Sequence, residues 1–360
     1  MLVQKKLLHL PEPFVTESGV ALKRPQIVYD DGGNPDGPVI LITHGGFADQ
    51  HVAGRYCAED PTPGWWDGLI GPGKAIDTDT FRVLCMNALG SMYGSTSPLT
   101  MNPDTGCRYG PHFPPITLID MARYQKAFLD AIGVEELHLV AGPAMGAMTA
   151  LQLAALYPEL IGAVVAVAGC VRTPPAALAA NQFIINVLTM DPAFQGGWYD
   201  LVRPLAAMKT VHQFLRIMSV HEDLLKTAVW DAVHEGVQAQ AERGRAISRY
   251  LTATLDIDVR DRDPNCYITL LGAINSYDLG RDVGDYEAGV LRIQCPVLLL
   301  SVDTDTVYRL EWAEEVADIL NTRMAGQARI GLIDSPWGHL GSIKETEQLC
   351  DFIASFVAAL

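Results

Sequence analysis

Three features are scarce in this chain of 360 residues: long apolar runs, basic residues and closely spaced cysteines. No run approaches the roughly 20 apolar residues that a membrane-spanning helix needs, and the apolar stretch at the N-terminus is too short for the core of a signal peptide. The net charge of −16 repels phosphate, which argues against binding to nucleic acid or to an anionic membrane. The seven cysteines form no C-x-x-C pair, so we expect reduced thiols and a cytoplasmic protein.

One residue is missing where a motif requires it. Residues 137–157 read LHLVAGPAMGAMTALQLAALY, an apolar run followed by Gly142-Pro-Ala144-Met-Gly146 and a helix-forming stretch. This is the frame of a nucleophile elbow, G-x-S-x-G, which holds a serine hydroxyl on a tight strand-to-helix turn for attack on a carbonyl. Ala144 keeps the small side chain of such a turn but has no hydroxyl oxygen. The motif predicts an acyl-transfer site without its nucleophile, in a chain that is nearly inactive.

Short, almost continuous apolar runs recur along the chain and are typical of strands buried on both faces of a parallel sheet. Helix-forming stretches separate them; one of these opens with a predicted capping box at Thr117 and Asp120. This alternation favours an α/β fold. The predicted strands cover 38–43, 81–87, 137–142, 163–168, 296–301 and 328–333.

The alternation stops between about 172 and 290, where the sequence is richer in charge and favours helices. We interpret 1–171 and 291–360 as the α/β core and 172–290 as a helical insertion. The insertion is either a lid over the active site or a packing or dimer surface, and the two roles can coexist.

A histidine and an acid follow the elbow in the order expected for this fold. Asp303 and Asp305 both come directly after the run 296–301, where a carboxylate can orient a histidine. His339 follows the run 328–333 in a loop rich in Gly and Pro, which makes it the candidate base. His212 and His221 fall in the insertion and His138 in a strand, so we expect structural or surface roles for them.

Two backbone N–H groups are expected to form an oxyanion hole. One belongs to Met145, which follows the nucleophile position. The other belongs to the loop Thr43-His-Gly-Gly46-Phe47, where Gly46 is the favoured donor and His44 is expected to brace the loop. No His/Cys/Asp cluster has the spacing of metal ligands, so no metal site is expected.

Several stretches resemble the homoserine O-acetyltransferase family of the α/β-hydrolase superfamily, and together they span most of the chain. They are GWWDGLIGPGKAIDT (64–78), NALG (87–90), GST (94–96) with NP (102–103), the elbow, DP (191–192) with GG (196–197), and NCYITLLGAINSYDLGR (265–281).

The resemblance implies an α/β-hydrolase fold, a homodimer and a Ser–Asp–His triad that works in two steps. An acyl-CoA, such as acetyl-CoA or succinyl-CoA, acylates the serine, and a small hydroxylated acceptor then takes the acyl group. By position, Ala144 stands at the nucleophile, Asp305 at the acid and His339 at the base.

Two positions depart from the family pattern. Leu340 stands where the family has an aspartate beside the histidine, and Lys209 is the nearest counterpart of an arginine that holds the substrate carboxylate. Homoserine itself is therefore a doubtful acceptor, and another alcohol or water remains open.

Three functions remain: a CoA-dependent O-acyltransferase, a hydrolase of an ester, thioester or amide on the same fold, and a ligand-binding protein without catalysis. The alanine is either an engineered replacement of serine or natural. One missing oxygen in an otherwise complete site favours engineering.

Overall fold

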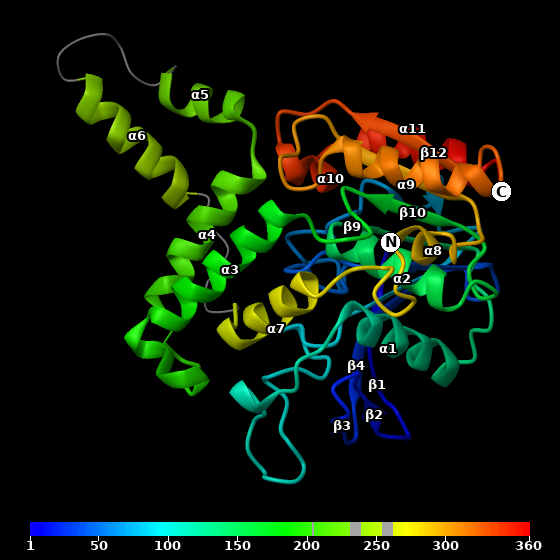
Figure 1. Ribbon diagram of the computed structural model, residues 1–360, viewed down its shortest axis with the longest axis horizontal. Helices are drawn as coiled ribbons and strands as arrows, with labels where there is room; N and C mark the ends of the chain where they lie inside the picture. Colours follow the sequence, from blue (N-terminus) through cyan, green and yellow to red (C-terminus); the bar gives the residue numbers. More distant parts are fainter. Residues whose placement is uncertain (204, 231–238, 254–261) are drawn as a thin grey trace.

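The computed structural model describes residues 1–203, 205–230, 239–253 and 262–360. In the described part an eight-stranded sheet has the strand order β1-β4-β8-β5-β9-β10-β11-β12 (Figure 1). The strands from β8 to β12 in this order all run parallel, whereas β4 pairs antiparallel with β8 and β1 antiparallel with β4. The strands are β1 (Gln4–His9), β4 (Gln26–Gly33), β5 (Val39–Ile42), β8 (Arg82–Met86), β9 (Leu139–Pro143), β10 (Val164–Val167), β11 (Val297–Val302) and β12 (Ala328–Ile333).

The six strands predicted from apolar runs are the six parallel strands, so the mostly parallel α/β sheet is confirmed. The edge strand β1 and its neighbour β4 were not predicted, because charged and polar residues interrupt them. Short strand pairs lie outside this sheet: β2 (Phe14–Val15) with β3 (Ala21–Leu22), and β6 (Ile70–Gly71) with β7 (Ile76–Asp77).

Successive strand residues point to opposite faces of the sheet, and each face has its own apolar core. Leu41, Leu84 and Val140 belong to the larger core, together with side chains of α1, α2 and α9. Ile40, Val83 and Leu139 belong to the second core, together with α11. The helices are α1 (Leu118–Ala131), α2 (Met145–Leu156), α8 (Tyr286–Val290), α9 (Leu310–Arg323), α10 (Gly341–Lys344) and α11 (Thr346–Val357). Burial on both faces explains why these strands are apolar throughout.

The predicted capping box at the start of α1 is present. The Thr117 hydroxyl accepts from the N–H of Asp120, and the Asp120 carboxylate accepts from the N–H of Thr117. This pair fixes the first turn of α1, which packs beside α2 on the same face of the sheet.

Helices follow one another between β10 and β11, and α3 to α6 extend to one side of the sheet (Figure 1). The predicted insertion of 172–290 includes 204, 231–238 and 254–261, which lie outside the described residues. No helix in the described ranges is long and apolar enough to cross a membrane. The described helices are α3 (Pro175–Met190), α4 (Ala206–Ser219), α5 (Glu222–Trp230), α6 (Ala239–Ala253) and α7 (Pro264–Asn275), and short 3-10 turns cover Gly110–His112, Pro192–Gly197 and Gly338–Leu340.

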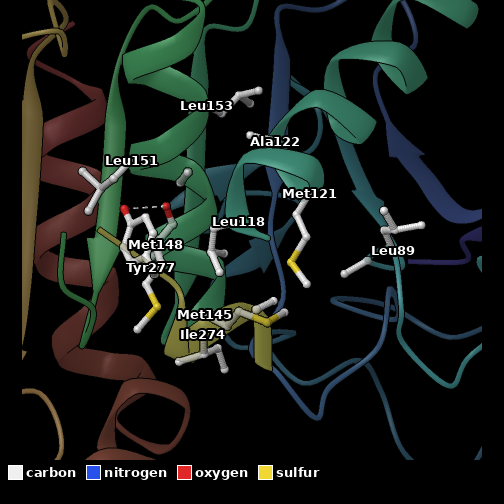
Figure 2. Close-up of a cluster of buried hydrophobic side chains, with 14 of the residues drawn as sticks. Leu89, Leu118, Met121, Ala122, Met145, Met148, Leu151, Leu153, Ile274 and Tyr277 are labelled. Atoms are coloured by element: carbon white, nitrogen blue, oxygen red, sulfur yellow. Dashed lines mark hydrogen bonds between the residues drawn. The ribbon is translucent and has the colours of Figure 1, made fainter. Parts of the chain in front are cut away.

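Helix α7 joins the insertion to the core. Figure 2 shows Met145 and Met148 of α2 beside Ile274 and Tyr277, at and just beyond the end of α7. The Tyr277 hydroxyl donates to the carbonyl oxygen of Met148 at 3.1 Å, the dashed line in Figure 2. The helix that begins at the elbow is therefore held directly by the end of the insertion.

Candidate active site

The elbow sits between β9 and α2, and Ala144 is its turning residue. Its backbone has φ 53° and ψ −122°, a conformation that residues with a side chain seldom adopt. The Ala144 N–H donates to the carbonyl of Val167 at 2.9 Å, and its carbonyl accepts from Met148 at 3.1 Å. These bonds hold residue 144 at the carboxyl end of β9, where ligands bind in open α/β sheets.

The two elbow glycines are required by the strand next to them. A Cβ on Gly142 would lie 2.2 Å from the carbonyl oxygen of Thr43, and a Cβ on Gly146 would lie 2.0 Å from the same atom. The Thr43 hydroxyl donates to the Gly146 carbonyl at 2.8 Å. The end of β5 thus touches the turn, which explains the glycine spacing in the motif.

The loop after β5 runs beside the elbow. A Cβ on Gly45 would be 3.8 Å from the Cβ of Ala144, and a Cβ on Gly46 would be 3.8 Å from the Sδ of Met145. Met145 is the first residue of α2, so its N–H has no partner within the helix. The structure therefore brings the loop of Gly46 next to the start of α2.

His44 is held by backbone groups on both ring nitrogens. Its Nδ1–H donates to the carbonyl of Gly45 at 2.7 Å, and its Nε2 accepts from the N–H of Ala88 at 2.9 Å. Complete burial lowers the pKa of His44, so the ring is neutral. These contacts are those of a side chain that braces the loop.

Asp305 and His339 are in direct contact at the ends of β11 and β12. The Nδ1–H of His339 donates to Oδ2 of Asp305 at 2.7 Å. The other carboxylate oxygen accepts from the N–H groups of Val307 at 2.7 Å and Tyr308 at 3.1 Å. The Asp305 side chain is fully buried, whereas His339 is 19% exposed, so the imidazole is the accessible member of the pair.

Opposing influences act on the His339 ring. Burial lowers its pKa, but the charge of Asp305 and the hydrogen bond to it raise the pKa more, and the result lies above the ordinary histidine value. The neutral form that a base requires is therefore lost as the pH falls through this raised pKa.

Asp303, the other acid left open by the sequence, contacts the chain that leads to His339. Its Oδ1 accepts from the N–H of Ser335 at 3.0 Å. The hydroxyl of Thr304 donates to the Ser335 carbonyl and accepts from Gly338 at 3.1 Å. Asp303 and Thr304 thus hold the loop, and Asp305 alone reaches the ring.

The two positions that depart from the family pattern lie on the insertion and on the His339 loop. Lys209 lies on the exposed side of α4, while its neighbours Met208 and Val211 are buried. Leu340 is half-buried and directly follows His339. The structure therefore places an apolar side chain, and no charge, at the position after His339.

The remaining candidate histidines make other contacts. His212 is buried in α4, with its Nε2 3.3 Å from the Tyr267 hydroxyl. Nδ1 of His221 lies 3.1 Å from a carboxylate oxygen of Asp223, and the ring of His138 stacks on Phe81.

Sequence reasoning missed a cation that contacts the loop of Gly46. The Nη1 group of Arg262 donates to the carbonyl oxygen of Phe47 and to the hydroxyl of Tyr93. No motif indicates this contact, because Arg262 is 215 residues from Phe47 in the chain and precedes the cap of α7. Within the described residues, no group of His, Cys, Asp and Glu could hold a metal ion.

The comparisons with known proteins agree on the fold. Residues 38–345 match the family described as alpha/beta hydrolase fold. A curated homoserine O-acetyltransferase from Symbiobacterium thermophilum is 36% identical over 338 residues, covering 91% of this chain and 87% of that protein. This chain belongs to the homoserine O-acetyltransferase family. Membership confirms the predicted α/β-hydrolase fold and the resemblance found from the motifs.

Solved structures of two different kinds are similar to this family member. Homoserine O-acetyltransferase from Bacillus anthracis has a TM-score of 0.90 at 25% identity, covering 99% of this chain and 98% of that one. Esterase E22 also has a TM-score of 0.90, at 26% identity, covering 99% of this chain and 100% of that one. The shared scaffold therefore accommodates a protein described as a transferase and one described as an esterase.

Proposed function

We propose that this chain carries the acyl-transfer site of its family with the nucleophilic oxygen removed. Ala144 stands at the nucleophile position, His339 is the base and Asp305 orients it. The N–H groups of Gly46 and Met145 form the oxyanion hole. In the serine form, acetyl-CoA or another acyl-CoA donates the acyl group to a small hydroxylated acceptor, and no cofactor is permanently bound.

The backbone of Ala144 carries this proposal. A non-glycine residue at φ 53° is strained, at a cost of roughly 1–3 kcal/mol. An alanine gains nothing from that strain, whereas a serine there would present its hydroxyl beyond the end of β9. The strained turn would hold a nucleophile at residue 144. The accessible ring of His339 and the buried Asp305 would activate it.

The reaction of the serine form follows from these positions. His339 takes the hydroxyl proton as the oxygen attacks the acyl carbon, and Asp305 stabilises the imidazolium that forms. The two N–H groups stabilise the oxyanion until the thiol of CoA leaves with the proton. A second hydroxyl, from an alcohol or from water, then attacks the acyl-enzyme by the same route.

Hydrolysis is the second candidate, and Leu340 favours it. An amino-acid acceptor carries charges that need partners when water is excluded from around them. Leu340 offers none, and Lys209 lies on the exposed side of α4. Water needs no such partners.

A third possibility is a natural protein that binds a ligand without catalysis. It differs from an engineered serine-to-alanine variant in one outcome, because only the latter regains activity when serine is restored.

A cytoplasmic location and a homodimer formed through the insertion helices belong to the same proposal. Equilibrium sedimentation tests the dimer.

The test is to assay Ala144→Ser beside the chain as given, with acetyl-CoA, a panel of hydroxylated acceptors and a chromogenic acetate ester. We expect turnover only in the serine form. CoA release that depends on an alcohol supports transfer, and release without one supports hydrolysis. A folded serine form that is inert towards every donor contradicts the catalytic proposal and supports the binding protein.

A further inference from the structure

The half-buried guanidinium of Arg262 lies beside the oxyanion loop. It donates to the carbonyl of Phe47, the residue that directly follows Gly46. Adjacent Cα atoms are about 3.8 Å apart, so Phe47, which Arg262 contacts, is one residue away from the proposed oxyanion donor Gly46. One small substrate could therefore contact both Gly46 and Arg262. It also donates to Tyr93 and lies against that ring, with 5.6 Å from Cζ to the ring centroid.

The positive charge of Arg262 has no negative partner among the described residues. Its two hydrogen-bond acceptors, a carbonyl and a phenol, are neutral, and its Nε is buried without any hydrogen-bond partner. Arg82 and Arg172, by contrast, contact carboxylates, at 2.9 Å from Asp31 and 2.8 Å from Asp278, whereas Arg108 resembles Arg262 in donating to a neutral backbone carbonyl. Because the described residues supply no counter-charge, a partly desolvated guanidinium here gains from an anion that reaches it.

Aromatic side chains lie beside Arg262 and beside the loop that it contacts. The ring of Phe47 stacks on Tyr267 with 4.0 Å between centroids, and the Tyr267 hydroxyl contacts His212. Burial first, and then the charge of Arg262, lower the pKa of His212 to about 4, so this histidine is neutral near pH 7. Aromatic rings and a neutral imidazole provide the dry surroundings in which an anion is held most strongly.

We propose that Arg262 binds a carboxylate carried by the substrate and thereby selects for acyl esters or acceptors that have one. Guanidinium suits this task, because its planar donors match the two oxygens of a carboxylate. The inference rests on the proposed function in that the ligand occupies the same acyl-transfer site. It assigns the charge-recognising role to Arg262 rather than to Lys209, which is exposed.

The chain as given suits the test, because without a nucleophile it binds esters at equilibrium. The probes are 3-acetoxypropanoate and its neutral analogue 3-acetoxypropanamide, measured by isothermal titration calorimetry. The variants are Arg262→Gln and Arg262→Lys. Arg108→Gln is the matched control, since Arg108 is also half-buried, donates to a backbone carbonyl (Tyr199, 2.7 Å) and has a buried nitrogen without a partner.

We expect Arg262→Gln to weaken binding of the carboxylate probe by about 10- to 100-fold, and to change binding of the amide by less than about twofold. Arg262→Lys should recover part of the loss, and Arg108→Gln should leave both probes unchanged. An equal loss for both probes means that Arg262 only supports the loop, and overturns the inference. So does undetectable binding of the carboxylate, or an unchanged affinity in Arg262→Gln.

The binding test of Arg262 and the activity test of Ala144→Ser can fail independently. If Ala144→Ser is inert but Arg262 still discriminates the probes, catalysis fails and the anion site stands. If Ala144→Ser is active and the probes are not discriminated, the anion site fails alone.

Discussion

Two histidine–carboxylate pairs in this protein look alike at first but differ in their surroundings. His339 and Asp305 are 2.7 Å apart, and His51 and Asp30 are 3.0 Å apart. Both carboxylates are buried. Asp305 follows β11 at the carboxyl end of a parallel strand, whereas Asp30 lies within β4 among antiparallel neighbours.

The donors to the two carboxylates also differ. Asp305 receives two peptide N–H groups besides the imidazole. Asp30 receives the imidazole and the hydroxyl of Tyr56 at 3.1 Å, and burial outweighs both and raises the pKa of Asp30 to about 6. A short distance to a histidine therefore does not identify a reactive pair. Position at the carboxyl ends of parallel strands and the two peptide N–H donors distinguish the pair of His339.

The largest expected difference between the two histidine–carboxylate pairs is in their effect on activity. In the Ala144→Ser form, Asp305→Asn should lower kcat by roughly 10⁴, as loss of the acid does in another triad enzyme, because the imidazole loses its orienting partner. Asp30→Asn in the same form should change kcat by less than about threefold. Steady-state kinetics with the best ester measures both, and a comparable loss in the two variants would erase the distinction between the pairs.

The elbow and the strand of Asp30 should respond differently to one added methyl group. Gly146→Ala places a Cβ 2.0 Å from the Thr43 carbonyl, so we expect a loss of about 4 kcal/mol or more in unfolding free energy. Gly32→Ala, on the strand of Asp30, meets side chains rather than backbone, Val3 at 2.8 Å and Met1 at 3.8 Å, and should cost less, about 1 kcal/mol. Urea unfolding compares them; equal costs would mean that the elbow is not tightly enclosed.

The pair of Asp30 should appear in the pH dependence of stability. Its folded-state pKa of about 6 exceeds the ordinary aspartate value of 3.8, so the folded chain binds more protons than the unfolded chain between these values. Stability attributable to Asp30 therefore falls as the pH rises from about 4 to 6, by about 3 kcal/mol in total. Asp30→Asn should gain that amount relative to the parent between pH 4 and pH 7. Parallel stability curves for the two proteins would show that Asp30 does not titrate in this way.

The smallest effect concerns the strain at the elbow. Glycine adopts a positive φ readily, so Ala144→Gly should leave stability unchanged or raise it by up to about 1 kcal/mol. Ala147→Gly, inside α2, should lower stability by about 1 kcal/mol. Thermal unfolding of these two variants measures the change in stability, and equal losses in both would mean that Ala144 is not strained.

Much of the sheet and part of the site could be predicted from the sequence. Strands buried on both faces leave continuous apolar runs, and the elbow leaves a glycine pattern because Thr43 touches both glycines. The residue pattern alone left both Asp303 and Asp305 open, and only the family resemblance selected Asp305, since the choice depends on where the His339 loop folds. The contact of Arg262 with Phe47 leaves no pattern, because a distant insertion brings the two residues together.

The measurement that tests the central claim most directly is to mix Ala144→Ser with acetyl-CoA, quench the reaction and search its peptides by mass spectrometry. The account predicts an acetyl group on residue 144, no acetyl group there in the chain as given, and loss of the adduct in the His339→Ala variant of the serine form. A folded serine form that is never acylated by acetyl-CoA or by an activated acetate ester would contradict the claim that this turn is the seat of a nucleophile.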